Sequence, residues 1–132
     1  MTVDNARTLR TPLARVRGLG SAHHGAGAGW TMRLTSLALV PLGAWFVVSV
    51  ISLAGAPLSE VRAWLGSPIQ ATLLLLTLAV TFHHSHHGVQ EIVEDYIHVK
   101  GVKMAVLIAS GFVHVLLAAL SLFSVLKIAF GG

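Results

Sequence analysis

The chain has 132 residues, of which 55% are hydrophobic and only 11% are charged. About a quarter of the residues in soluble domains are charged, so this composition excludes an ordinary soluble domain and indicates a membrane protein. The sequence contains no cysteine. Disulfides, thiolate zinc sites and iron-sulfur clusters ligated by this chain are therefore excluded as well.

Three long uncharged runs dominate the sequence, if histidine is counted as neutral. They cover residues 34–59, 63–90 and 104–126, and each exceeds the roughly 20 residues that a helix needs to cross the hydrocarbon core. We predict an all-α membrane protein with three transmembrane helices, at about 30–54, 68–95 and 102–130. No apolar signal core precedes residue 30, so the first run is expected to remain as a helix.

Positive charge gathers in two regions, the N-terminal arm 1–29 and the connection between the second and third helices. The arm carries four arginines against one acid, and the connection holds Lys100 and Lys103. Cytoplasmic segments of membrane proteins are enriched in lysine and arginine. We therefore expect a cytoplasmic arm, a three-helix transmembrane domain over 30–132 and a C-terminus on the far side of the membrane. The net charge of +4 then reflects orientation, and we expect no nucleic-acid partner.

Four histidines in residues 81–96 directly follow an apolar run. Ionisable side chains at membrane depth are costly and are functional by default, and neutral imidazole binds iron, zinc or copper. At 100° per residue, two adjacent stripes form on the second helix. One stripe holds His84, Gly88, Glu91 and Asp95, and the other holds His83, His87, Gln90 and Glu94.

Two kinds of cofactor suit these histidines. Gly88, one turn beyond His84, leaves room for a flat macrocycle, which favours haem over a compact ion. His83 with His86 or His87 could equally chelate a divalent metal. His86 points away from both stripes, and we expect it to be an interfacial residue.

On the third helix, His114 lies at a depth similar to that of His84. It could be the second ligand of a self-contained cytochrome b. The interpretation we favour is a hydrogen bond from its imidazole to a neighbouring carbonyl.

Two motifs carry a family resemblance. The pattern of His, three residues, Gly, six residues and Asp-Tyr falls on His84, Gly88, Asp95 and Tyr96, and the first helix begins with Trp30-Thr-Met-Arg33-Leu-Thr35. Both patterns resemble those of the smaller hydrophobic membrane anchor, the D subunit of bacterial type, of succinate dehydrogenase (respiratory complex II). Chain length and the three crossings agree over nearly the whole sequence.

The resemblance implies a component of succinate:quinone oxidoreductase that is not a complete catalyst by itself. It implies a haem b shared with a second anchor subunit of C type, with His84 as one axial ligand; His83 and His87 remain alternatives for the iron. It also implies a flavoprotein subunit with FAD and an iron-sulfur subunit docked on the cytoplasmic face. Ubiquinone would bind near that face, in contact with Tyr96.

Four residues have a plain chemical role beside the one the resemblance implies. Tyr96 offers a phenolic donor to a quinone and Asp95 could deliver protons, although Asp-Tyr at a helix end is equally an interfacial anchor. Arg33 could pair with a haem propionate or assist the quinone pocket, or it could reach the interface to fix topology. Trp30 fits an aromatic belt near the pocket.

Two alternative functions remain open. One is a stand-alone small membrane cytochrome b with His84 and His114 as ligands. The other is a histidine-rich membrane protein that binds or transports a metal through His83, His86 and His87.

Overall fold

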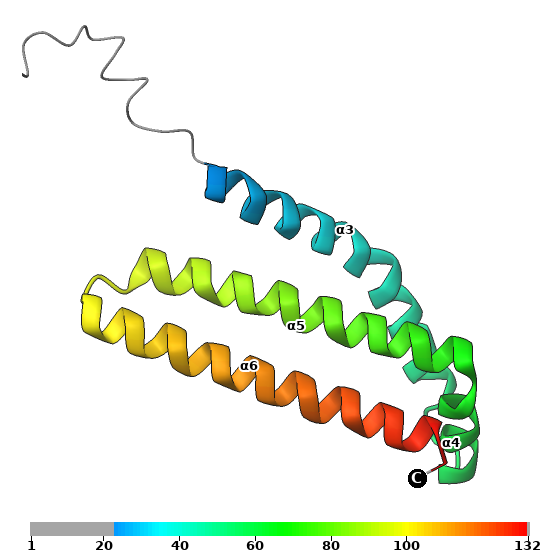
Figure 1. The fold of residues 1–132 in the computed structure, drawn as a ribbon. Coiled ribbons are helices and arrows are strands. Elements are labelled where there is room, and N and C mark those ends of the chain that lie inside the picture. The colour runs from blue at the N-terminus through cyan, green and yellow to red at the C-terminus, as the bar shows by residue number, and fades with distance from the viewer. Residues whose placement is uncertain (1–22, 132) are drawn as a thin grey trace, which may run out of the picture. The chain divides into compact units, whose positions relative to one another are not determined.

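The computed structural model describes residues 23–131, so most of the predicted cytoplasmic arm lies outside the described residues. These residues form four helices and no strand: α3 (His23–Ser52), α4 (Leu58–Gly66), α5 (Pro68–Tyr96) and α6 (Lys100–Ala129), as Figure 1 shows. The predicted all-α class is confirmed. Residues Thr31–Gly132 form one compact unit, and the residues up to Trp30 belong to a separate one.

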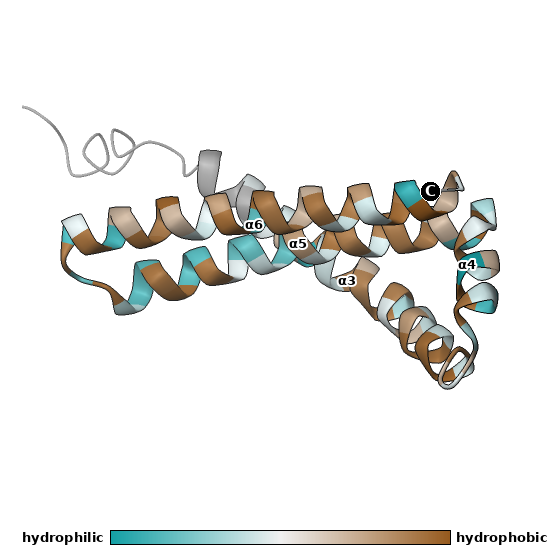
Figure 2. Cartoon of the chain, turned by 90° about the horizontal axis from the view of Figure 1, so that it is seen from below, coloured by the Kyte–Doolittle hydropathy of each residue, from teal (hydrophilic) through white to brown (hydrophobic). Residues whose placement is uncertain are grey.

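Three of the helices correspond to the three predicted crossings. The part of α3 from Gly29 to Ser52 and the whole of α6 are each long and apolar enough to span a membrane. The third crossing meets the same criterion only when α5 is counted together with α4, from which it is bent by 86°. The reason is the polar C-terminal half of α5, visible in teal in Figure 2 beside the largely brown α6. By length and composition, the described residues therefore contain two helices that could cross a membrane, or three if the bent pair is one span.

The segment between α3 and α5 contains α4, a helix that the sequence analysis did not predict. The chain leaves α3 through Gly55, whose φ of +80° is in the left-handed region that glycine adopts without strain. Trp64 of α4 stacks on Trp45 of α3 with 5.8 Å between ring centroids and 19° between planes. Such an offset-stacked pair stabilises the contact beyond its buried area, so it holds α4 against α3.

The ends of α5 follow from local chemistry. Pro68 occupies the first turn, where its missing N–H costs no hydrogen bond, and the predicted start of this helix is confirmed. At the other end Lys103 Nζ donates to the Glu94 carbonyl oxygen at 2.8 Å. A cation at a helix C-terminus satisfies a free carbonyl and interacts favourably with the helix dipole.

Little apolar surface is buried within the chain. The helices α5 and α6 run antiparallel and side by side (Figures 1 and 2). Nevertheless only five hydrophobic residues among those described are buried: Leu42, Leu65, Ala71, Val93 and Val125. Side chains such as Phe112 and Leu37 are 74% and 71% exposed. Apolar surface this extensive needs lipid or further transmembrane helices around it.

Candidate functional site

The histidine predicted to bind iron lies on the side of α5 that faces α3. His84 is half-buried, and its Nδ1 is 2.9 Å from the hydroxyl oxygen of Thr35. No hydrogen bond engages its Nε2 among the described residues. An imidazole held through one ring nitrogen and open at the other is the usual arrangement of a metal-ligating histidine.

Gly88 lies on the same side of α5 as His84. A Cβ placed on Gly88 would be 3.7 Å from Cε of Met32 on α3, which is an ordinary van der Waals contact. His84 and Gly88, two members of the first predicted stripe, therefore both face α3. A flat ring packed on Gly88 would share this face with the Met32 side chain, which is unbranched and adaptable.

The second predicted stripe is also found in the structure. The rings of His83 and His87 meet edge to face with 4.7 Å between centroids, and Gln90 Nε2 donates to Glu94 Oε1 at 2.8 Å. Both pairs are four residues apart, the spacing at which side chains on a helix are neighbours. His83 is exposed, while His87 is half-buried.

His86, which we expected to be an interfacial residue, lies against α6. Its ring lies 5.3 Å from that of His114 on α6, centroid to centroid, and its Cε1 would be 3.8 Å from a Cβ built on Gly111. The reason is that α6 passes on this side of α5, which spacing along a single helix cannot reveal. His86 Nδ1 is buried and has no hydrogen-bond partner among the described residues.

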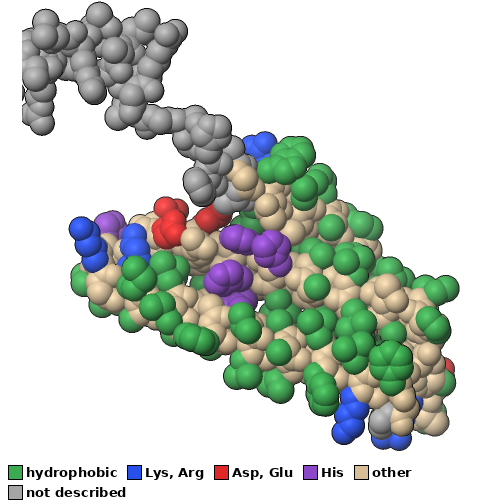
Figure 3. Space-filling model, in the orientation of Figure 1, with side chains coloured by type: hydrophobic (Ala, Val, Ile, Leu, Met, Phe, Trp, Pro, Cys, Tyr) green, Lys and Arg blue, Asp and Glu red, His purple; other side chains and the backbone are tan. Residues whose placement is uncertain are grey.

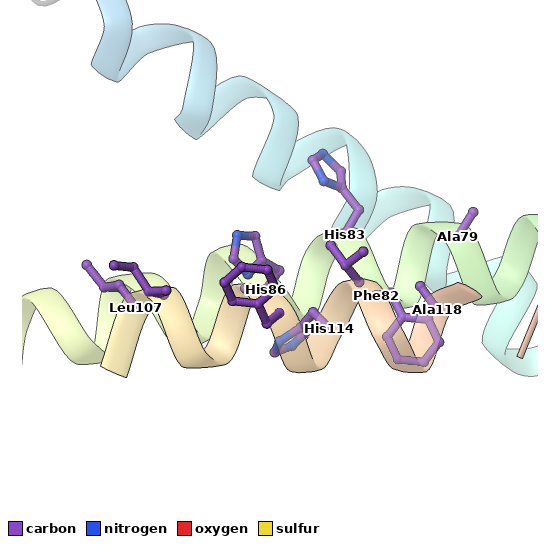
Figure 4. Close-up of a pocket in the computed structure, with 11 residues that line it drawn as sticks. Ala79, Phe82, His83, His86, Leu107, His114 and Ala118 are labelled. Atoms are coloured by element: carbon purple, nitrogen blue, oxygen red, sulfur yellow. The ribbon is translucent and has the colours of Figure 1, made fainter. Parts of the chain in front are cut away.

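The His114 side chain forms a hydrogen bond within its own helix, α6. Its Nδ1 donates to the carbonyl oxygen of Ser110 at 2.8 Å, which confirms the predicted bond to a neighbouring carbonyl. An open cavity of about 640 Å³ lies beside it, with an otherwise apolar lining that includes His83, His86 and His114 (Figure 4). In the space-filling view several imidazoles gather in the middle of this face, and another lies apart from them among lysine and arginine side chains (Figure 3).

His84 and His114 are not brought together. His84 bonds to α3, whereas His114 contacts His86 in the groove between α5 and α6. This arrangement gives no support to a self-contained cytochrome with these two ligands. Nor do the described residues contain a group of three or more histidine, aspartate or glutamate side chains that could hold a metal ion.

The residues predicted for the quinone site all lie at the surface. Tyr96 ends α5 and is 79% exposed, Trp30 is 61% exposed, and Asp95 and Arg33 are exposed. Within the described part of the chain, no hydrogen bond or ion pair joins any two of them. Their polar groups are therefore available to a ligand or to another subunit.

Thr35 is the residue to which the sequence analysis gave no role. It stands in the motif at the start of the first helix, two residues after Arg33. A hydroxyl on an apolar helix is the one local signal. That signal gains meaning only from the pairing of α3 with α5, which places Thr35 beside His84.

Comparison with known proteins identifies the family. Residues 7–126 match the family described as succinate dehydrogenase/fumarate reductase transmembrane subunit. The chain is 31% identical over 86 residues to the succinate dehydrogenase hydrophobic membrane anchor subunit of Paracoccus denitrificans, a match that covers 65% of this chain and 67% of that protein.

A second relative extends the match along the chain. The anchor subunit of the same description from Rickettsia bellii is 25% identical over 109 residues, which cover 83% of this chain and 84% of that protein. No solved structure matches the chain significantly. The histidine-bearing helix thus lies in a protein that belongs to the succinate dehydrogenase/fumarate reductase transmembrane subunit family.

Proposed function

We propose that this chain is the D-type anchor of a bacterial succinate:quinone oxidoreductase, which supplies an axial ligand to haem b and part of the ubiquinone site. In this proposal it pairs with a C-type anchor in the inner membrane, with its N-terminus in the cytoplasm. The flavoprotein and iron-sulfur subunits dock on the cytoplasmic side. Family membership and the exposed apolar helices support the assembly.

The single observation that carries the haem assignment is the environment of His84. Its Nδ1 is bonded to Thr35 and its Nε2 is open, so a neutral imidazole is held in place with one lone pair available to iron. When bound, a haem with two imidazole ligands supplies electron transfer without an open coordination position. In this proposal the second imidazole comes from the partner anchor, and Arg33 can pair with a propionate through its guanidinium.

The quinone assignment rests on Tyr96 and Asp95 at the end of α5. The phenolic O–H of Tyr96 can donate to a quinone carbonyl, and the carboxyl group of Asp95 can relay protons from the aqueous side. Reduction of ubiquinone to ubiquinol takes up electrons from the soluble subunits and protons from the aqueous side. Both side chains are exposed, so a quinone held between this chain and its partners could reach them.

Purification of the chain from mildly solubilised membranes tests the assembly. We expect three other subunits to accompany it: a second hydrophobic anchor, an iron-sulfur protein and a flavoprotein. The reduced-minus-oxidised spectrum of the preparation should contain a b-type band. A chain that purifies alone, or with partners but without haem, contradicts the proposal.

Replacement of Gly88 by alanine tests the packing of haem on α5. The new methyl group would be 3.7 Å from Met32 Cε, so the chain itself accommodates it, and alanine favours the helix by up to about 1 kcal/mol over glycine. If the macrocycle lies on Gly88, the haem content per anchor should still fall. The control is Gly111→Ala on α6, where a Cβ would be 3.8 Å from His86 and where we expect full haem content. Equal haem in both variants contradicts packing on Gly88.

A further inference from the structure

We propose that Thr35 is the positioning residue of the haem site: its hydroxyl fixes the tautomer and ring orientation of His84 and raises the basicity of Nε2. The inference rests on the proposed role of His84 as a haem ligand. It adds a residue of α3 to a site otherwise assigned to α5. The basis is the set of three short contacts made by the Thr35 hydroxyl oxygen.

Only one assignment of protons makes all three contacts hydrogen bonds. The Thr35 oxygen is 2.9 Å from the Thr31 carbonyl oxygen, 3.0 Å from the Met32 carbonyl oxygen and 2.9 Å from His84 Nδ1. Carbonyl oxygens only accept, and a hydroxyl has a single proton to donate. With that proton directed at the carbonyls of its own helix, the Thr35 oxygen accepts from His84, and the proton of the imidazole lies on Nδ1.

A proton on Nδ1 leaves the lone pair on Nε2. Which nitrogen of a histidine binds a metal is set by the hydrogen bond of the other nitrogen, and an acceptor there increases the electron donation of the ring. Both side chains are half-buried. Thr35 and His84 are 49 positions apart in the sequence. Their hydrogen bond therefore also attaches the imidazole ring of His84, on α5, to a second helix, α3.

The other histidines of the cluster lack such an anchor. His83 and His87 contact each other, His86 Nδ1 has no hydrogen-bond partner among the described residues, and His114 bonds to a carbonyl of its own helix. Of the four histidines on α5, only His84 is hydrogen-bonded to another helix within the described chain. His84 is therefore the histidine of α5 whose ring is best positioned for the proposed role.

Three variants of the intact complex test this role. Thr35→Val keeps the shape of the side chain but removes the acceptor, whereas Thr35→Ser keeps the hydroxyl. The matched control is Ser36→Ala, because Ser36 also bonds to the Met32 carbonyl, at 2.8 Å, but is exposed and does not contact His84. The measurements are the haem affinity of each purified complex and the midpoint potential of its b-type haem.

For Thr35→Val we expect haem affinity to fall by about 10- to 100-fold, the usual effect of removing an outer-shell partner. The midpoint potential should rise, since a less basic imidazole stabilises ferric iron less. Thr35→Ser and Ser36→Ala should keep the wild-type affinity and potential. An unchanged Thr35→Val complex overturns the inference, and so does a Thr35→Ser or Ser36→Ala variant that is impaired as much as Thr35→Val.

A His84→Ala complex in the same series separates the two proposals. If it keeps its haem, the proposed haem ligand is wrong, and the role of Thr35 fails with it. If it loses its haem while Thr35→Val has wild-type affinity and potential, only the positioning role is overturned.

Discussion

Replacement of His84 by alanine is expected to abolish the b-type haem of the assembled complex. Among the described histidines of α5, His84 is the one whose ring is hydrogen-bonded to another helix and whose second nitrogen is open. The alanine side chain is a methyl group and cannot bind iron. The single remaining ligand, from a partner subunit, would bind haem far more weakly. Loss of an outer-shell partner typically weakens metal binding by about 10- to 100-fold, and loss of a direct ligand should cost at least as much. We therefore expect the reduced-minus-oxidised b band to fall by at least about tenfold.

Neighbouring histidines supply the matched controls for this experiment. His83→Ala and His87→Ala each remove an imidazole one or three positions away, and His114→Ala removes the imidazole of α6 that contacts His86. All three should keep the b band. A complex that keeps its haem without His84 but loses it without His83 or His87 transfers the ligand to the second stripe. If the His114→Ala variant and the His84→Ala variant each lose the haem, the result supports a site in which this chain supplies both ligands.

The fold was largely predictable because a membrane helix requires a long run of apolar residues, which can be recognised from the local composition of the sequence. The uncharged runs located α3, α5 and α6, and Pro68 located the start of α5. The helix α4 was not predicted, since it has only nine residues and these are mixed in polarity. Its contact with α3 through Trp45 and Trp64 joins residues far apart in the sequence, and no local pattern reveals it.

The site was predictable along one helix and not across helices. Helical spacing correctly placed His84 with Gly88 and His83 with His87. It could not show that Thr35 would bond to His84 or that α6 would cover His86, because both depend on how the helices pair.

Replacement of Tyr96 by phenylalanine is expected to slow quinone reduction while leaving the haem in place. The side chain is 79% exposed and its hydroxyl forms no hydrogen bond within the described chain, so the substitution removes no contact that stabilises the fold. If the phenol donates to a quinone carbonyl, its loss costs about 1–1.5 kcal/mol. This corresponds to roughly a tenfold decrease in kcat/KM for a soluble ubiquinone analogue.

Two measurements on the same Tyr96→Phe preparation distinguish a quinone contact from an interfacial anchor. Succinate-driven reduction of a dye that takes electrons from the soluble subunits should be unchanged, and the b band should have wild-type size. An anchor that depends on the phenol at the headgroup level would instead weaken assembly, lowering subunit content, dye reduction and quinone reduction together. Wild-type quinone turnover in Tyr96→Phe would show that the hydroxyl does not contact the quinone, because the ring that remains has no group able to donate to a carbonyl.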